Sequence, residues 1–364
     1  MSNKPVKIAL GISNTSWDGR FTEALDEKRA AGYPLSYDWL NLDRQDWLDR
    51  LKPYDMVIWK PYQMGVERSL YLKEKTYMLE KRLHKLVIPN YDSLWHFESK
   101  VAQSYLFAEE GIPTPATTVT FDHHEAEFKI AETNFPLVFK RGEGAGSQNV
   151  RLVTNRNAAM RLWAKAFCSQ VYCEARQQGR RWYHIAPRAF WKRWFWEWLR
   201  HRLRRTDSVG YLYWQEFLDG NAADLRITVI GDRYAYGFWR NNRPNDFRAS
   251  GSGRIDFDRA IPENCVLACM EISRRLNFDS MAYDILFRGD QFVIGEISYG
   301  YLDSAPYRAS GHYEMRSDAK LAFVPGHVWP ETLWIAWALQ RWENRNGQST
   351  SLGDPTENLQ PGTS

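Results

Sequence analysis

Apolar and polar positions alternate in blocks along the first ninety residues, and the blocks predict strands separated by helices. Short apolar runs flanked by polar loops are typical of buried strands, and the charged segments between them have helical character. The predicted strands are 7–13, 54–59 and 86–90, and the predicted helices are 21–31, a stretch ending near 51, and 67–84. Strands that alternate with helices predict a small parallel α/β domain over residues 1–90.

Shorter blocks follow, and they predict a second region of mixed strands and helices. The predicted helices are 93–111 (with Ser93 as N-cap), 127–132, 156–167 and 263–276. The predicted strands are 135–140, 150–153, 169–174, 211–218, 224–232 and 234–240. Residues 343–364 contain almost no apolar side chains, and a disordered tail is expected there.

The most informative stretch is Met281–Tyr301, which predicts a hairpin with one acidic residue on each strand. Glu296 and Ser298 share a face because strand side chains alternate. Asp284 joins that face if the turn has three or five residues, whereas a two-residue Gly-Asp turn would place it opposite. Paired carboxylates favour a bound Mg²⁺ that also carries a nucleotide phosphate. The alternative is a solvated hairpin face with chance acids.

A glycine-rich segment directly follows the predicted strand that ends at Lys140. Gly142, Gly144 and Gly146 alternate, and Ser147 follows. Such a backbone can approach an anion closely, and the preceding lysine favours phosphate as that anion. A flexible hairpin loop is the alternative.

Composition excludes several other classes of protein. The chain has 364 residues, four cysteines without CxxC spacing, and no apolar run near the length of a membrane span. Its start lacks the features of a signal peptide, so a cytoplasmic location is expected. No GxGxxG follows Ile12, which argues against dinucleotide binding. His123 and His124 are interpreted as a solvated loop pair, and we find no Ser-His-Asp or Cys-His signature.

The net charge of +4 conceals a basic aromatic insert at 180–206. Residues 188–205 hold seven basic side chains and one glutamate, a net charge of +6, so the rest of the chain carries −2. On a helix, Trp191, Trp194 and Trp198 would lie on an apolar stripe beside arginines. Such a helix suits the surface of an anionic membrane. Packing against protein is the alternative; single-stranded RNA is also conceivable in chemical terms, but nucleic acid is not expected because no RNA-binding motif accompanies the insert.

Seven motifs stand in a fixed order between about residues 90 and 303. They are a helix with Lys100, Gly111–Pro115, Lys140 with its glycine loop, Gln215–Phe217, Asp224–Arg226, Phe247–Gly253 and the acidic hairpin. This order resembles the ATP-grasp superfamily, and within it the glutathione-synthetase-like and RimK-like carboxylate–amine ligases. Two of the motifs, 246–253 and 296–300, also look like ATP-grasp proteins of bacterial surface-polysaccharide gene clusters.

The resemblance implies an α/β (α+β) fold with two parts. Residues 1–90 would form a preATP-grasp domain, and 91–330 a two-lobed ATP-grasp domain with lobes at about 91–214 and 215–330. It also implies roles for particular residues. ATP would be bound by Lys100, Lys140, Gly144, Ala145, Gly146 and Ser147, and its adenine by the hinge Gln215, Glu216, Phe217 and Leu218.

The resemblance places Mg²⁺ on Asp284, Glu296 and Ser298, where relatives usually have asparagine at the third position. Arg226 and Arg248 match positions that hold phosphate or the acyl-phosphate. Either could instead be an ordinary surface arginine, or form an ion pair with the aspartate two residues before it, Asp224 or Asp246.

The implied activity is ATP-dependent amide formation between small-molecule carboxylate and amine substrates, with the carboxylate on a sugar or glycan precursor. Two alternatives remain. A kinase of the same superfamily would phosphorylate a hydroxyl, and a membrane-associated protein could bind nucleotide without ligase activity.

Overall fold

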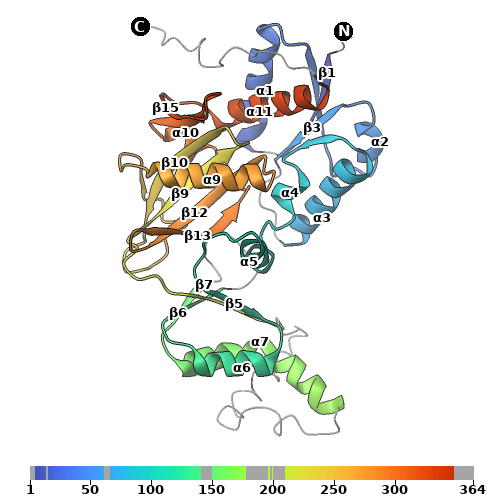
Figure 1. Cartoon of the computed structure of the whole chain (residues 1–364). Coiled ribbons are helices and arrows are strands. Elements are labelled where there is room, and N and C mark those ends of the chain that lie inside the picture. Colours follow the sequence, from blue (N-terminus) through green and yellow to red (C-terminus); the bar gives the residue numbers. More distant parts are fainter. Residues whose placement is uncertain are drawn as a thin grey trace.

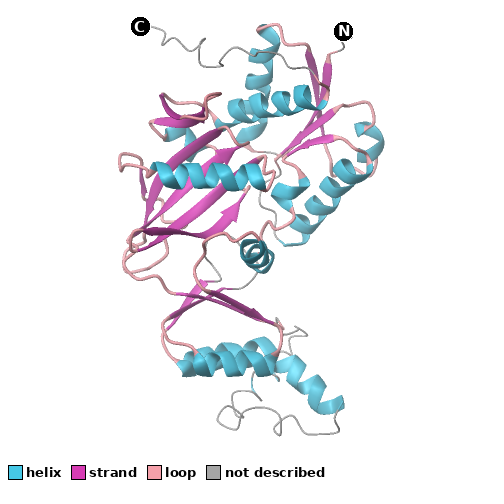
Figure 2. Ribbon diagram, viewed as in Figure 1, coloured by secondary structure: helices cyan, strands magenta, loops and turns pink. Residues whose placement is uncertain are grey.

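Three β-sheets organise the protein, whose structure is a computed structural model. It describes residues 5–13, 15–60, 66–140, 150–177, 196, 199 and 210–347. A parallel sheet and a large antiparallel sheet form the main body, and a small sheet with two helices projects from it (Figures 1 and 2). The expected α/β class is confirmed.

The N-terminal sheet is parallel, as predicted, and has four strands in the order β2-β1-β3-β4. The strands are β1 (Val6–Gly11), β2 (Leu35–Leu40), β3 (Met56–Trp59) and β4 (Leu86–Ile88). The helices are α1 (Ser16–Ala30), α2 (Trp47–Leu51) and α3 (Val66–Tyr77), which continues into a π-helix, Met78–Arg82. Strand β2 was not predicted, because it lies at the sheet edge and alternates buried with exposed positions.

The predicted helix at 93–111 is two helices, α4 (Tyr91–Leu94) and α5 (Lys100–Glu109). The proposed N-cap at Ser93 is wrong. Asn90 caps α4, and its side chain accepts a hydrogen bond from the backbone amide of Ser93. Ser99 caps α5 in the same way. Two strong capping side chains nine residues apart start two helices instead of one.

The small sheet has the order β5-β8-β6-β7 and is covered by α6 and α7 (Figure 1). Its strands are β5 (Thr117–Thr120), β6 (Leu137–Lys140), β7 (Val150–Val153) and β8 (Leu212–Glu216). The helices α6 (His123–Glu132) and α7 (Arg156–Gln177) pack on each other and on this sheet, around the buried Trp163 and Phe167.

Two expectations fail in this region. The predicted strand at 169–174 is the continuation of α7, where Val171 is buried and extends the apolar face of the preceding turns. His123 and His124 are not a solvated loop pair. They open α6 behind the N-cap Asp122, and His123 is buried.

The large sheet is antiparallel and has the order β13-β12-β9-β10-β14-β15, with β11 paired to β10. Its strands are β9 (Ala223–Ile230), β10 (Tyr234–Asn241), β11 (Ile255–Asp256), β12 (Ser280–Arg288), β13 (Gln291–Ser298), β14 (Gly311–Met315) and β15 (Leu321–Pro325). Helix α9 (Glu263–Arg275) packs on one face, against Leu225, Ile227 and Val229.

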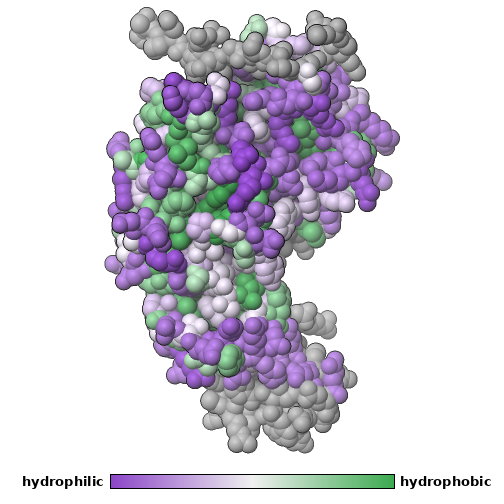
Figure 3. Space-filling model, in the orientation of Figure 1, coloured by the Kyte–Doolittle hydropathy of each residue, from purple (hydrophilic) through white to green (hydrophobic). Residues whose placement is uncertain are grey.

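The opposite face of the large sheet is covered along only part of its length. Near Ile230 and Tyr236 it packs against α11 (Pro330–Arg345) and the N-terminal sheet, beside α10 (Ser304–Arg308). Because side chains alternate along β9, Arg226 and Asp224 lie further along the same face. Each of them lines one of two cavities. In Figure 3, the apolar side chains on the side shown gather around the middle of the body, and polar ones cover much of the rest.

Helix α11 extends into the predicted tail. Glu343 is buried in its last turn and accepts a hydrogen bond from the hydroxyl of Tyr33, so the tail cannot begin at 343. Residues 348–364 lie outside the described part of the chain, as does nearly all of the basic aromatic insert. Among the described residues, no helix combines the length and the apolar character needed to cross a bilayer.

Candidate active site

The two acids of the hairpin lie directly opposite each other. Strands β12 and β13 pair Arg288 with Gln291, so the turn has two residues, and this turn was expected to separate the acids. A bulge between Asp284 and Ile285 corrects the register. Ile285 pairs with Ile294 and Asp284 pairs with Glu296, which leaves Gly295 as the extra residue. One extra residue reverses the side-chain alternation, so the bulge puts both carboxylates on one face.

Asp284 belongs to a buried network of four charged side chains. Arg226 donates to it twice, from Nε at 2.7 Å and from Nη2 at 2.9 Å. Arg240 of β10 lies 2.8 Å from Asp284 Oδ2 and also donates to both oxygens of Asp224. These contacts follow from strand register, which places Asp284 beside Arg226 and Arg240 beside Asp224.

Burial and charge act in opposite directions on the two aspartates. Burial alone would raise the pKa of Asp284, but Arg226 and Arg240 outweigh it and lower that pKa. For Asp224, burial prevails over Arg240 and raises the pKa. The two arginines therefore favour the ionised form of Asp284, which stands next to Glu296.

Glu296 is the more accessible of the paired acids, and two lysines face it. Its side chain is 37% exposed, and its Oε1 lies 3.4 Å from Nζ of the buried Lys100. Lys140, at the end of β6, is the second lysine. Burial lowers the pKa of Lys140 to about 8, Glu296 opposes the change and Lys100 reinforces it. The two cations are close enough to affect each other, which suits an anion that carries several charges.

A cavity of about 400 Å³ opens between the small sheet and the large sheet. Lys140, Asp284 and Glu296 lie on its wall, with the expected hinge 215–218 beside them. Val138 and Leu286 supply apolar surface. A cavity lined by apolar side chains, a hinge segment and a lysine suits a nucleotide.

The hinge side chains themselves point to structural partners. Gln215 donates to the hydroxyl of Thr117 at 2.9 Å, and Glu216 forms an ion pair with Arg288. Phe217 packs edge-on against Phe247, with ring centroids 5.7 Å apart. These contacts fix the course of the segment, whose second half, Phe217 and Leu218, lies beyond the paired strand β8.

A second cavity, of about 590 Å³, lies on the other side of the paired acids. Asp284 and Glu296 again form part of its wall, together with Arg226 and Arg240. Lys60, which directly follows strand β3 of the N-terminal sheet, also lies on the wall. The segment 249–253 contributes backbone and hydroxyl groups. Cationic side chains outnumber acidic ones on this wall by four to three, which suits an anionic ligand.

Lys60 is an unusual wall residue because its ammonium lies among aromatic rings. Its Nζ lies 3.2 Å from the centroid of Trp17 and 4.1 Å from that of Tyr301, and it donates to the Tyr301 carbonyl at 2.7 Å. Burial lowers the pKa of Lys60 well below its ordinary value, although Glu331 and Asp303 oppose this. The cation–π contacts and one carbonyl do not fully replace water around the ammonium.

Comparisons with known proteins agree with this architecture. The alpha-aminoadipate–LysW ligase LysX of Saccharolobus solfataricus is 26% identical over 160 residues, which make up 44% of this chain and 45% of that relative. A RimK domain ATP-grasp protein of Sphaerobacter thermophilus has a TM-score of 0.52 at 16% identity, covering 82% of this chain and 93% of the other. D-alanine–D-alanine ligase of Bacillus anthracis, complexed with ATP, has a TM-score of 0.50 at 11% identity, over 94% and 99%.

The chain folds as an ATP-grasp protein. No family model matches it, and the aligned part covers less than half the length of the curated relative. The fold that the resemblance seen in the sequence implied is confirmed by these structures.

The ATP-grasp fold brings most of the expected site residues together. Lys140, Asp284, Glu296 and the hinge line the first cavity, while Lys100, Arg226 and Ser298 line the second. The segment Gly144–Ser147 lies outside the described residues. The Ser298 hydroxyl makes hydrogen bonds with the backbone of Gly300, so it is engaged locally.

Arg248 contributes to the wall of a cavity and also forms an ion pair. It lines the first cavity and binds Asp246 through Nε at 2.9 Å and through Nη2. The alternative of an ion pair with the aspartate two residues earlier therefore holds for Arg248. For Arg226 it is wrong, because Arg226 pairs with Asp284 across the strands while Asp224 pairs with Arg240.

Two charged residues on the walls of these cavities were not found from the sequence. Arg240 could have been found from the turn between β9 and β10, since the pairing of Ile230 with Tyr234 sets Arg240 opposite Asp224. Lys60 gave no signal, because its position depends on how the N-terminal sheet meets the large sheet.

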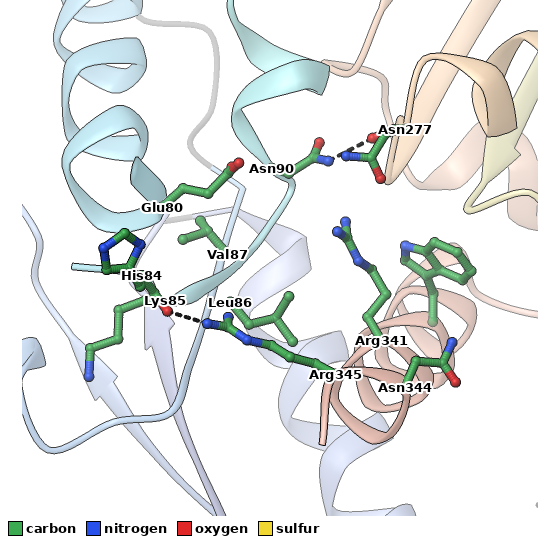
Figure 4. A pocket seen from close by; sticks show the side chains of 11 residues that line it. Glu80, His84, Lys85, Leu86, Val87, Asn90, Asn277, Arg341, Asn344 and Arg345 are labelled. Carbon is green, nitrogen blue, oxygen red and sulfur yellow. Dashed lines mark hydrogen bonds between the residues drawn. The ribbon is translucent and has the colours of Figure 1, made fainter. Parts of the chain in front are cut away.

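A third cavity, of about 490 Å³, lies elsewhere, between β4 and α11 (Figure 4). Two arginines reach into it from α11, and both already have partners. Arg341 pairs with the buried Asp279, and Arg345 donates to the carbonyl of His84 at 2.6 Å. We assign it no role in the active site.

Proposed function

We propose that this chain is an ATP- and Mg²⁺-dependent ligase that joins a carboxylate to an amine through an acyl-phosphate. The observation that carries the proposal is the position of Asp284 and Glu296, which form part of the wall of both cavities. A phosphoryl group that passes between two substrates needs two adjoining sites with charge stabilisation where they meet. The ligases among the similar proteins support the same activity.

The first cavity is the proposed ATP site. Adenine would lie against the backbone of Gln215–Leu218, and the phosphates would extend towards Lys100 and Lys140. Bound phosphate would replace Glu296 as the counter-charge for these lysines. The segment Gly144–Ser147 is proposed to cover the phosphates.

The paired carboxylates fit a magnesium ion. Glu296 and one oxygen of Asp284 would hold Mg²⁺, with Ser298 as the third protein ligand, and hard oxygen ligands of this kind suit it. When bound, the ion neutralises charge on the phosphate oxygens. Ser298 is the weakest of the three, since its hydroxyl is shared with Gly300.

Arg226 has to exchange partners during the reaction. In the structure both oxygens of Asp284 accept hydrogen bonds from Arg226. A transferring phosphoryl group offers Arg226 a stronger planar set of acceptors, and its arrival would free an Asp284 oxygen for the ion. Arg240 stays in place, because it holds Asp224 at the same time.

The second cavity is the proposed site of the carboxylate substrate, with Lys60, Arg226 and Arg240 as its cations. A carboxylate oxygen attacks the γ-phosphorus, and the bond from that phosphorus to the oxygen of ADP breaks. The amine nitrogen then attacks the carbonyl carbon, phosphate leaves, and the nitrogen loses a proton. The arginines stabilise charge on the transferring group.

Hydroxylamine trapping tests the proposal. The protein is incubated with ATP, Mg²⁺ and a panel of uronic acids and amino acids, with phosphate release and product mass as the readouts. An acyl-phosphate yields a hydroxamate with hydroxylamine, whereas a phosphate ester does not. A stable phosphorylated product without hydroxamate would establish the kinase instead. ATP binding without turnover on any acid would favour a nucleotide-binding protein.

Two narrower parts of the proposal come from the sequence. The motifs at 246–253 and 296–300 support an acid carried on a sugar or glycan precursor. The insert at 188–205 supports contact with an anionic membrane surface. Uronic acids in the panel address the first, and vesicle binding addresses the second.

A further inference from the structure

Two histidines and a glutamate converge on the outer helices of the small-sheet lobe. His123 and His124 open α6, and Glu174 lies in the last turn of α7. Nε2 of His123 is 2.5 Å from Oε2 of Glu174, and Nε2 of His124 is 3.8 Å from Oε1 of the same carboxylate. One ligand atom from each of the three side chains lies within 4.8 Å of the other two.

We propose that His123, His124 and Glu174 form a binding site for a divalent transition metal, with Zn²⁺ as its best-suited ion. Zinc is bound by imidazole nitrogens and carboxylate oxygens at about 2.0–2.2 Å, and tetrahedral geometry then spaces the ligand atoms by roughly 3.4 Å. The two distances above lie on either side of that spacing. A small rotation of the Glu174 carboxylate would bring both distances towards that spacing.

The surroundings of the three side chains also suit a bound ion. The His123 side chain is 10% exposed and packs against Trp163 and Phe167, so one ligand is held rigidly. The side chains of His124 and Glu174 are 64% and 31% exposed, which leaves an open side for entry and for water as a fourth ligand. The N-terminus of α6 opposes a cation, but the nearby Asp122 and Glu174 carboxylates offset it.

Selectivity distinguishes this site from the proposed magnesium site. Imidazole nitrogen prefers zinc, copper and nickel, whereas Mg²⁺ prefers oxygen. The ion would replace the hydrogen bond between His123 Nε2 and Glu174, and the neutral imidazole would carry its proton on Nδ1. It would then fasten the start of α6 to the last turn of α7, three residues before α7 ends at Gln177.

Zinc titration of the chelator-treated full chain in excess Mg²⁺ tests the site, with calorimetry as the readout. The expected result is one Zn²⁺ per chain, with affinity about tenfold lower or worse in H124A and in E174Q. Co²⁺ should show the visible absorption of a tetrahedral nitrogen–oxygen site, and zinc should raise the melting temperature of the parent more than that of H124A.

Two control variants keep the result specific. H327A removes a histidine elsewhere on the chain, and E296Q removes an acid of the proposed magnesium site; both should retain the zinc affinity of the parent. Because His124 is mostly exposed, H124A should fold even if E174Q does not. Equal zinc binding by the parent and H124A, or loss of it in E296Q alone, would overturn the proposal.

Discussion

Among single residues, Glu296 is the side chain on which the proposed reaction depends most. Glu296→Gln keeps the shape and removes the charge, so ATP turnover should fall by on the order of 10²-fold or more with an unchanged melting temperature. Glu271→Gln, an exposed acid on α9, is the matched control and should be silent. Phosphate release and a thermal melt check both variants. Near-parental turnover in Glu296→Gln would exclude Glu296 from the metal site.

The lowered pKa of Lys140 sets the expected pH dependence of nucleotide binding. Because burial lowers the pKa of Lys140 to about 8, the free protein loses this charge as the pH rises through 8. The value of kcat/KM for ATP should therefore fall above about pH 8. Lys140→Arg keeps the charge and should move the fall to higher pH. Identical pH profiles for the two proteins would show that Lys140 does not contact phosphate.

The same shift in the pKa of Lys140 affects stability in a defined direction. The lysine is charged in the unfolded chain up to about pH 10.4 but only up to about 8 in the folded protein, so the unfolded state binds more protons in between. Its contribution to the free energy of unfolding therefore rises over that interval.

Among elements, the β12–β13 hairpin uses its bulge to absorb one extra residue, Gly295. If Gly295 were deleted, Glu296 would move up by one position and would pair with Asp284 in a regular ladder after the same two-residue turn. Deleting Gly295 should therefore preserve measurable turnover. Inserting one glycine after Gly295 should turn Glu296 to the opposite face and abolish turnover. Turnover and circular dichroism compare the two; the reverse ranking would contradict this role of the bulge.

The insert at 188–205 is the other element with a separable prediction. Binding to phosphatidylglycerol vesicles should weaken with salt, as the Debye length falls from about 10 Å at 0.1 M to about 3 Å at 1 M. Serine at Trp191, Trp194 and Trp198 should remove the salt-resistant part and leave folded, ATP-binding protein. Sedimentation with vesicles and a thermal melt measure this. Unfolding of the variant, without vesicle binding by the parent, would rule out the membrane.

For the whole molecule, the second cavity depends on the contact between the N-terminal sheet and the large sheet. Lys60→Met fills the same space among Trp17 and Tyr301 without an ammonium to desolvate, so the melting temperature should rise. With the acid found in the panel, KM for that acid should increase at least tenfold, while KM for ATP stays the same. Lys7→Met, at an exposed residue on β1, is the control.

Equal changes in both KM values would contradict the assignment of the second cavity to the acid. A lower melting temperature would instead show that the Lys60 ammonium stabilises the aromatic cluster.

The sequence by itself determined most of the local elements and the order of the motifs. Apolar periodicity was sufficient for β1, β3 and β4, because buried strands are short and continuous in apolar character. It was insufficient for the edge strand β2. It also failed at the end of α7, where Val171 is buried because it continues the apolar face of the helix. Capping side chains set helix boundaries that periodicity did not, since Asn90 and Ser99 start two separate helices.

Only the tertiary structure decided which charges meet. The bulge at Gly295 placed Asp284 beside Glu296, although the two-residue turn was expected to separate them. The order of the strands brought Arg226 and Arg240 into ion pairs with Asp284. Lys60 reaches the second cavity because two sheets meet there. Pairing across strands and sheets joins residues that are distant in sequence, and local patterns carry no information about such distances.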